Sequence, residues 1–256
     1  VDAMVGDKVS PAVIRLAGAV SGGYRDKAPE DVGLRQYPGG LEAYREFVKL
    51  HTTMDVTPEQ VHEIGLRNVA RIAGEMAKIR TELGFSGTPA EFKESLRENP
   101  RLFPKRPEEI GERLMSYMTR IEPVVDQYFG RRPKAPYGVK RLDPQLEPGQ
   151  TFGYYQVPTA TDPRGYYNYN GSNLADRSLL NAGALAYHEL VPGHHFQINL
   201  ALENPAIPEF RRESFDTAFT EGWGEYAAGL AGEMGMYKDP YDRYGRLAME
   251  MFVSVR

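Results

Sequence analysis

The sequence predicts a mainly α-helical protein with one small β-sheet, and three observations support this fold class. The chain has 256 residues, of which 41% are apolar and 26% charged, so it can bury a large core. On both sides of a central segment, apolar residues recur at three- and four-residue spacing, as in amphipathic helices. The central segment, about 130–172, is instead rich in proline, glycine and tyrosine, which is typical of short strands joined by turns.

The composition excludes several kinds of partner and of site. The balance of 31 basic against 35 acidic residues gives a formal net charge of −4, so we expect no nucleic-acid partner. Because the chain has no cysteine, disulfides, thiolate catalysis and cysteine-based metal sites are excluded. No stretch approaches the roughly 18–20 apolar residues that span a bilayer, and residues 1–7 lack a signal-peptide pattern. The compartment, cytoplasmic or exported, stays open.

Residues 1–40 are expected to form an irregular lead-in. Glycines and prolines recur in this segment, and we expect at most one short helix there, around residues 11–20. The remaining residues, 41–256, are expected to form one helical domain, which opens with a helix at about 41–51. Because the sequence stops at Arg256 inside an apolar periodic run without a helix-stop residue, we expect this domain to be truncated at its C-terminus.

Start signals locate the next helices. Thr57, followed by proline, glutamate and glutamine, predicts a capped helix over about 58–83, with an apolar stripe that marks it as part of the core. The same signal at Thr88 predicts a helix to about residue 98. A further helix is expected over about 107–129, with Pro123 as a kink.

The second half combines strands with further helices. The tyrosine-rich stretches at 154–157 and 165–170 predict short strands in a sheet region of about 150–172. Helical patterns then follow at about 174–191, 193–203, 213–235 and from 239 onward.

Histidines cluster near residue 190. Only five occur in the chain, and three of them are His188, His194 and His195. His188 is followed by Glu189, and a histidine–glutamate pair on a helix with a further histidine nearby is the arrangement of metal-dependent hydrolases. In such sites imidazoles bind Zn²⁺ at about 2.0–2.1 Å, and the carboxylate takes a proton from the water that the metal activates.

The spacing of these histidines requires a break in the helix. In a regular helix, His194 would lie about 9 Å along the axis from His188 and His195 about 10.5 Å, so neither would share a metal with it. Proline at 192 interrupts the helical hydrogen bonding and Gly193 tolerates unusual dihedral angles. We therefore expect the helix to break at this pair, which would let two imidazoles converge.

A zinc site needs a third protein ligand and leaves a fourth position for water. The best candidates are Glu221 and Glu225, which lie one turn apart on a predicted helix and face the same way. From the spacing alone, either could bind the metal while the other orients an imidazole.

Two motifs resemble a known family. The sequence H-E-L-V-P-G-H-H-F-Q at 188–197 is similar to the H-E-x-x-P-G-H-[HFY]-x-Q pattern of the bacterial DUF885 proteins, and E-G-W-G-E-Y at 221–226 is similar to their E-G-W-A-x-Y segment. The helix start at 57–66 also resembles one in the family. Gly224, where the pattern has alanine, is a departure.

The resemblance implies a mainly helical, gluzincin-like metallopeptidase relative that binds one zinc ion. It implies His188, His194 and Glu221 as ligands and Glu189 as general base. His195 and Glu225 occupy the looser positions of the two patterns. They are implied either as alternative ligands or as residues that orient a ligand without touching the metal. The family's chains are about twice this length and continue into a segment with a D-T-G-x-H motif, so this piece is expected to turn over poorly if that segment stabilises the transition state.

The tyrosines near the motif admit two interpretations. Tyr166, Tyr167 and Tyr169 are typical of packing in a sheet. Alternatively, because gluzincins bind extended substrate along a strand edge upstream of the metal helix, residues 165–170 would line the cleft and bind substrate here. Tyr226 is a further candidate, as a donor to an oxyanion.

The leading hypothesis is a zinc-dependent peptidase that acts on short peptides. The alternative is a non-catalytic helical peptide-binding protein with a structural metal or none. Hydrolysis of a non-peptide amide or ester is a third possibility. Substrate length and sequence, exo- or endo-action, native metal and oligomeric state are not given by the sequence.

Overall fold

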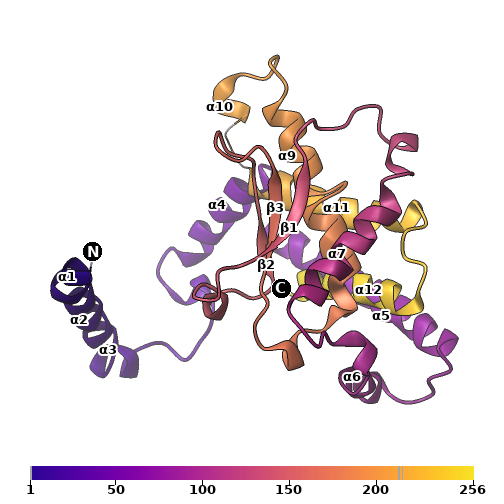
Figure 1. The fold of residues 1–256 in the computed structure, drawn as a ribbon. Coiled ribbons are helices and arrows are strands. Elements are labelled where there is room, and N and C mark those ends of the chain that lie inside the picture. Colours follow the sequence, from indigo (N-terminus) through magenta and orange to yellow (C-terminus); the bar gives the residue numbers. More distant parts are fainter. Residues whose placement is uncertain (1, 213, 215) are drawn as a thin grey trace. The chain divides into compact units, whose positions relative to one another are not determined.

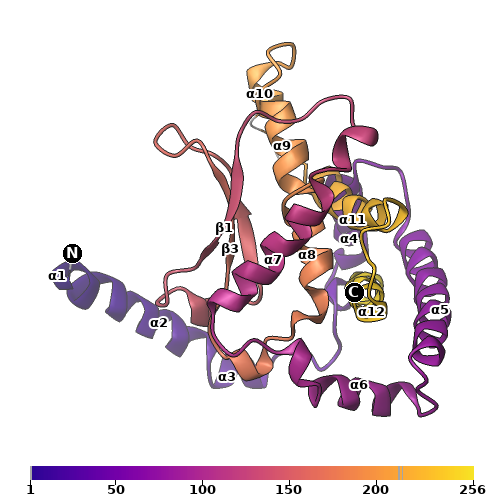
Figure 2. The ribbon, with the colours of Figure 1, turned by 45° about the vertical axis from the view of Figure 1, so that its right-hand side comes forward.

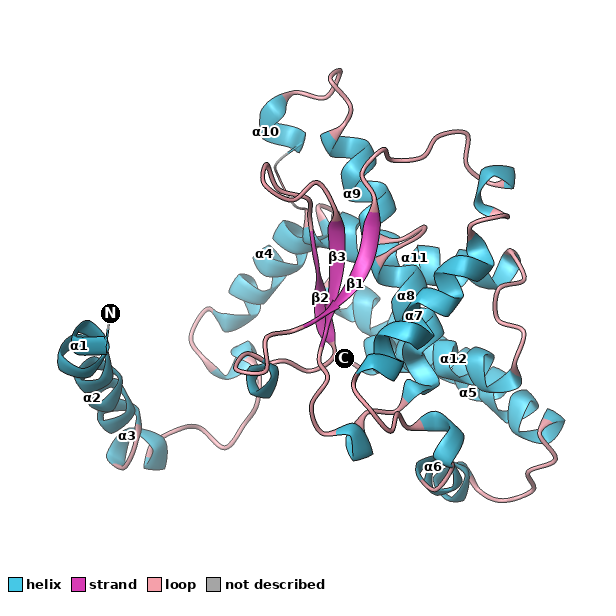
Figure 3. Ribbon diagram, viewed as in Figure 1, coloured by secondary structure: helices cyan, strands magenta, loops and turns pink. Residues whose placement is uncertain are grey.

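The computed structural model describes residues 2–212, 214 and 216–256. Helices dominate this part of the chain, and the strands form one three-stranded sheet (Figures 1 and 3), which confirms the predicted fold class. The chain divides into two compact units, Val1–Leu50 and His51–Arg256. The second unit carries every candidate site residue.

The first unit is more helical than expected. Its helices are α1 (Asp2–Met4), α2 (Ser10–Val20), α3 (Gly23–Asp26) and the first part of α4 (Gly40–Thr52), with a π-helical turn η1 (Val5–Val9) and a 3-10 turn η2 (Leu34–Gln36) between them. The short helix expected near Pro11 is α2, and Pro11 lies in its first turn, where a proline is tolerated. Helical turns, however, already begin at Asp2. The unit ends after Leu50 rather than residue 40. The reason is that the start of α4 packs on η2: a Cβ on Gly40 would lie 1.8 Å from the carbonyl oxygen of Leu34.

The start signals of the next helices act as expected. In α5 (Pro58–Glu82) and α6 (Pro89–Arg97), the threonine before the helix and the third helical residue form complete capping boxes. The second half of α5 packs with α6 and with α12 (Pro240–Val255) around a buried cluster. In the first half, Gly65 lies against the backbone of Ser254 on α12, but the apolar side chains of Val61 and Ile64 are exposed. The predicted core stripe of α5 is therefore half right.

Two predicted helices are shorter than expected. Helix α7 (Glu108–Ile121) ends before Pro123 instead of bending there, and only a 3-10 turn η4 (Val125–Gln127) follows. Helix α8 (Ala182–Glu189) begins eight residues after the predicted start at 174. The residues before it form two 3-10 turns, η6 (Leu174–Asp176) and η7 (Leu179–Asn181), because the side chain of Ser178 caps the second turn.

The remaining helices are α9 (His194–Leu202), α10 (Glu209–Arg212), α11 (Thr217–Glu233) and α12. Helix α11 begins after its cap Asp216, whose side chain accepts from the backbone N–H of Phe219. The predicted start of this helix at 213 lies outside the described residues.

The sheet contains one strand that the sequence did not predict. Strands β1 (Tyr137–Arg141), β2 (Gly153–Gln156) and β3 (Gly165–Tyr169) are ordered β1-β3-β2, with β1 parallel and β2 antiparallel to β3. Strand β3 is therefore the central strand, and β2 is an edge. Strand β1 was missed because its sequence, Y-G-V-K-R, lacks the alternating apolar pattern of a half-buried strand.

Within the second unit, α7 and α8 lie on one face of the sheet (Figure 2). Their buried side chains form one core with Tyr167 and Tyr169 of β3 and with α11. Because α8 is covered by the sheet side, by α7 and by α11, apolar residues surround it on every side, and it carries the first half of the histidine motif into the core.

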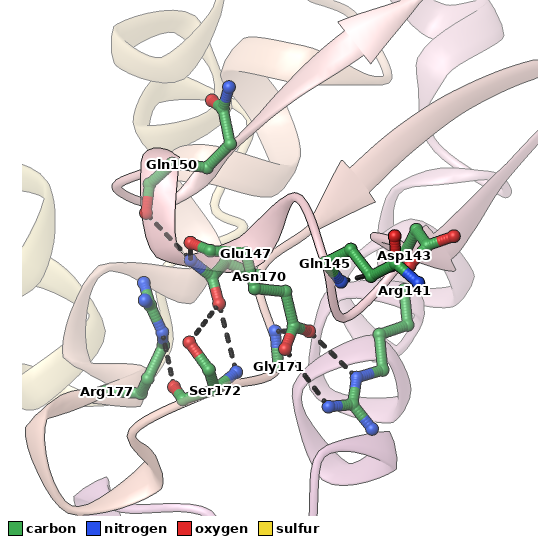
Figure 4. A network of polar contacts seen from close by, with 9 residues as sticks. All are labelled: Arg141, Asp143, Gln145, Glu147, Gln150, Asn170, Gly171, Ser172 and Arg177. Carbon is green, nitrogen blue, oxygen red and sulfur yellow. Dashed lines mark hydrogen bonds and ion pairs between the residues drawn. The ribbon is translucent and has the colours of Figure 1, made fainter. Parts of the chain in front are cut away.

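A buried polar network fixes the loop between β1 and β2 (Figure 4). Glu147 is 3% exposed, accepts from the Arg141 guanidinium at 2.8 and 3.1 Å, and accepts from the backbone N–H of Gly171 at 2.8 Å. The side-chain amide of Asn170, also buried, donates to the carbonyls of Glu147 and Gln150. The network joins the end of β3 to the loop that leads into β2.

Candidate metal centre

The chain breaks its helix between the two halves of the histidine motif, as predicted. Helix α8 ends at Glu189 and α9 begins at His194, with a cis peptide bond before Pro192. Gly193 must be a glycine, because a Cβ there would lie 1.8 Å from the carbonyl oxygen of His188. The break turns α9 back toward α8, so that the two imidazoles meet.

Three side chains converge on one point. The Nε2 atoms of His188 and His194 lie 3.1 Å apart, and the Glu221 carboxylate oxygens lie 3.4 Å from the first and 3.7 Å from the second. These are the residues that the resemblance implies as ligands, and among the described residues they form the group with metal-ligand spacing. Helix α11 brings Glu221 to the imidazoles, and its carboxylate is 60% exposed, which leaves one side of the point open.

The spacing of these atoms fits a tetrahedral zinc site. Ligand atoms at 2.0–2.1 Å from zinc and at tetrahedral angles are about 3.3–3.4 Å from one another. The two Nε2 atoms are 3.1 Å apart, and the Glu221 carboxylate lies near this value from both imidazoles, through Oε2 at 3.4 Å from His188 and Oε1 at 3.7 Å from His194. The Nδ1 atom of His194 is buried and has no hydrogen-bond partner among the described residues, while its Nε2 faces the point shared with His188 and Glu221. The donor set of two imidazoles and one carboxylate is one that zinc accepts.

The charges around the point favour a cation. Burial opposes the charged form of His188, but hydrogen bonds to Glu221 and Glu225 and the nearby Glu189 charge outweigh burial and raise its pKa. Burial, together with the adjacent His188 charge, lowers the pKa of His194. These shifts favour a positive charge on His188 and a neutral His194, so a cation among the carboxylates is favoured at this point.

Glu225 lies behind His188 rather than in the group of three. Its Oε1 is 3.3 Å from Nδ1 of His188, and its Oε2 is 3.9 Å from a guanidinium nitrogen of Arg246 on α12. Burial raises the pKa of Glu225, but the His188 hydrogen bond and the charges of His188 and Arg246 more than offset this and keep it below its ordinary value. Glu225 therefore orients an imidazole from the side opposite the ligand point.

The E-G-W segment holds the break in place. The indole N–H of Trp223 donates to the carbonyl of Pro192 at 2.8 Å. The neighbouring Gly224 lies against the His188 ring. A Cβ on Gly224 would be 2.7 Å from the Cε1 and Nε2 atoms of His188. The departure from the family's alanine thus lies at a direct contact with a candidate ligand.

Glu189 faces an open pocket beside the three ligands. The pocket has a volume of about 510 Å³ and is lined by Glu189, His194 and Glu221 together with β2 and Ile198. Burial raises the pKa of Glu189 to about 7, although the His188 charge opposes the shift. A carboxylate with this pKa beside a metal point is suited to accept and return a proton near neutral pH.

His195 points away from the ligand point. It is fully buried, its Nε2 lies 3.0 Å from the carbonyl of Ala135, and its Nδ1 lies 2.8 Å from the Tyr155 hydroxyl. Both ring nitrogens are engaged, and the geometry therefore separates His195 from His194.

The predicted substrate-binding tyrosines lie elsewhere. Tyr166, Tyr167 and Tyr169 are on β3, which is paired on both sides, so the expected substrate edge at 165–170 is wrong. Tyr167 and Tyr169 are buried in the core. Tyr226 is 56% exposed and packs on Trp223 with ring centroids 5.7 Å apart.

Sequence reasoning did not assign roles to Tyr155 and Arg246. Tyr155 lies on β2, which lines the pocket, and its hydroxyl meets His195. Strand β2 was predicted, but its position in the sheet was not. Because β1 pairs with the other side of β3, β2 lies at an edge, and only this strand order reveals the role of Tyr155. No local signal marks Arg246, because its contact with Glu225 joins α12 to α11.

The fold and the site define a mainly helical protein that gathers two imidazoles and one carboxylate beside a half-buried glutamate. Residues 1–256 match the family "Bacterial protein of unknown function (DUF885)", and the chain belongs to this family. The resemblance carried by the two motifs is thereby confirmed.

One solved structure with a similar fold is described as that of the "putative lipoprotein from Colwellia psychrerythraea". It is 31% identical, superposes with a TM-score of 0.88, and its match covers 98% of this chain and 44% of its own. The chain thus spans less than half the length of this relative. No protein with a curated description matches the chain. Among the described residues, every helix is too short or too polar to cross a bilayer.

Proposed function

We propose that this protein is a zinc-dependent peptidase that hydrolyses short peptides. The observation that carries the proposal is the convergence of His188, His194 and Glu221 at tetrahedral spacing beside Glu189. When bound there, a zinc ion would polarise a peptide carbonyl and make water a stronger nucleophile. Three protein ligands leave one position open, which is the difference between a catalytic and a structural site.

Each residue of the chain has a distinct task in this proposal. His188, His194 and Glu221 hold the ion, and Glu225 orients the His188 ring through Nδ1. Glu189 is the general base: it takes a proton from the attacking water and returns it to the leaving amine. Its raised pKa matches this double task, because a carboxyl with a pKa near the working pH both accepts and donates a proton.

Substrate would lie along β2 rather than β3. The backbone N–H of Asn170 donates to the carbonyl of Phe152 at 2.9 Å, and hydrogen bonding alternates along an antiparallel pair. Tyr154 and Gln156 therefore bond to β3, whereas the backbone groups of Gly153 and Tyr155 face away from it. These outward groups border the pocket that contains Glu189, so an extended peptide can add to this edge.

The rival function is peptide binding without catalysis, with a structural ion or none. A structural zinc is closed by a fourth protein ligand. The described residues bring three ligand side chains to the point, and one of them is largely exposed. This open side favours the peptidase over the rival.

The test compares wild-type protein with Glu189→Gln. We expect wild-type protein to bind one zinc ion, to cleave members of a defined dipeptide and tripeptide library, and to lose this activity in chelator. Glu189→Gln removes the base but no ligand, so zinc content should be unchanged while turnover falls by at least about 10²-fold. Full turnover in Glu189→Gln contradicts the base assignment, and a metal-free wild-type protein after zinc addition contradicts the proposal as a whole.

A further inference from the structure

His195 has no place among the ligands, yet it is among the most deeply buried polar residues near the site. Its Nε2 faces the carbonyl of Ala135 at 3.0 Å. A carbonyl only accepts hydrogen bonds, so Nε2 carries the proton and Nδ1 is left as an acceptor. The hydroxyl of Tyr155 lies 2.8 Å from Nδ1 and therefore donates to it.

Asn199 completes this contact from one turn farther along α9. It is 2% exposed, and its side-chain amide donates to the Tyr155 hydroxyl at 2.9 Å and to the carbonyl of His195 at 2.7 Å. Burial raises the pKa of Tyr155 to about 12, so the hydroxyl remains a donor throughout the neutral range. Strand β2 is thus fastened to α9 through one side chain, the Tyr155 hydroxyl, which donates to His195 and accepts from Asn199.

The neighbouring strand leaves room for this contact. A Cβ on Gly165 of β3 would lie 2.2 Å from the Tyr155 hydroxyl oxygen and 2.8 Å from Nδ1 of His195. Such distances do not occur between real atoms, so an alanine here would displace the hydroxyl. Gly165 therefore has a specific reason to be glycine.

The main chain of Tyr155 borders the pocket that Glu189 faces. Its backbone groups face away from β3, as derived above, and Tyr155, Glu189 and His194 line the same pocket. The side chain of Tyr155 is bonded to α9, and α9 also carries His194. The contact therefore relates the position of the β2 edge to that of a candidate ligand.

We infer that Tyr155, held by His195 and Asn199, is a positioning residue that fixes the edge of β2 beside Glu189 and His194. This inference rests on the proposed function for its catalytic part, while the anchoring of β2 stands on the contacts alone. It gives His195 a role distinct from that of His194.

The test uses Tyr155→Phe, which removes only the hydroxyl. Tyr117→Phe is the matched control, because the Tyr117 hydroxyl also makes a buried hydrogen bond, to Asp242 at 2.6 Å, but lies outside the site. Hydrogen exchange of the amides of residues 153–157 is measured in both variants. We expect about tenfold faster exchange in Tyr155→Phe and wild-type exchange in Tyr117→Phe.

Turnover and zinc affinity are measured on the same proteins. With the most rapidly cleaved peptide of the library, we expect kcat of Tyr155→Phe to fall roughly 10- to 100-fold, since a displaced β2 edge would misplace the substrate relative to Glu189 and rate falls steeply with such misplacement. Zinc affinity should stay within about twofold, because no ligand is changed. Gly165→Ala should reproduce both effects, and the double variant should be no worse than either single one.

The outcomes separate the two proposals. Unchanged exchange of residues 153–157 in Tyr155→Phe overturns the inference, whether or not any peptide is cleaved. Faster exchange with unchanged kcat overturns the link to Glu189. If wild-type protein binds no zinc and cleaves no peptide, the proposed function fails, while the exchange data still decide whether Tyr155 anchors β2.

Discussion

His194 and His195 are adjacent in sequence but face opposite environments. His194 turns its Nε2 toward His188, and His195 turns both nitrogens toward Ala135 and Tyr155. The sequence alone could not separate them by helical spacing, because the break at residues 190–193 resets the geometry. Only the family pattern favoured His194, and the structure places His194, not His195, in the group with metal-ligand spacing.

This difference predicts opposite effects of substituting the two histidines. His194→Ala removes a ligand, so its zinc affinity should fall by more than roughly 10- to 100-fold. That range is the loss expected when only a residue that supports a ligand is removed. His195→Asn should keep one zinc per chain, because it removes no ligand. Elemental analysis and zinc titration of the folded variants check this. Retained zinc in His194→Ala, or loss in His195→Asn with native circular dichroism, would reverse the assignment.

At the scale of the element, the break between α8 and α9 was the most informative prediction. Proline at 192 and Gly193 showed where the helix stops, but no local pattern indicated which residue holds the loop in place. The structure shows that the holder is Trp223 on α11, two residues after Glu221. The two motifs of the family are thus parts of one assembly.

Trp223→Phe should loosen this loop without touching a ligand. It retains an aromatic ring but leaves the carbonyl of Pro192 unpaired, so we expect about 1–3 kcal/mol lower stability and roughly tenfold weaker zinc binding. Tyr237→Phe is the control, since it loses a comparable bond to the carbonyl of Ala228 elsewhere on α11. Urea unfolding and zinc titration measure both. Equal zinc affinity in the two variants would show that the Trp223 hydrogen bond does not support the zinc site.

Elements with local signals were predicted well, and elements set by distant contacts were not. The starts of α5, α6 and α12 follow from a capping side chain and a proline within the first turn. By contrast, β1 depends on pairing with β3, some 28 residues later in register. A strand defined by such pairing carries little signal of its own.

At the scale of the second unit, this missed strand changes the interpretation of the site. With β1 on one side and β2 on the other, β3 becomes the centre of the sheet, and its residues Tyr167 and Tyr169 become core. The free edge beside the pocket passes to β2, and the Glu147 network anchors the loop that leads into it. The candidate ligands were thus predictable from motifs, whereas the substrate edge required the sheet order.

The Glu147 network predicts how stability depends on pH. The Arg141 hydrogen bond, together with the Gly171 N–H, holds the pKa of Glu147 below its ordinary value of 4.5 despite burial. The unfolded chain therefore binds a proton at a higher pH than the folded one, and this stabilisation is full above pH 4.5 and lost as pH falls through the folded pKa.

Glu147→Gln removes the ionisation and nearly preserves the shape. Its deficit in unfolding free energy relative to wild type should be largest above pH 4.5 and should shrink at lower pH. Urea unfolding across pH 3–7 measures this difference. A deficit that stays constant or grows as the pH falls would show that the carboxylate is not stabilised in the folded state.

The most direct test of the central claim is anomalous diffraction at the zinc edge from crystals of the protein with added zinc. We predict one peak, about 2.0–2.1 Å from Nε2 of His188, Nε2 of His194 and a Glu221 oxygen, with the fourth position free of protein. A peak bound by His195, a shell closed by a fourth side chain, or no peak among these three residues would contradict the account.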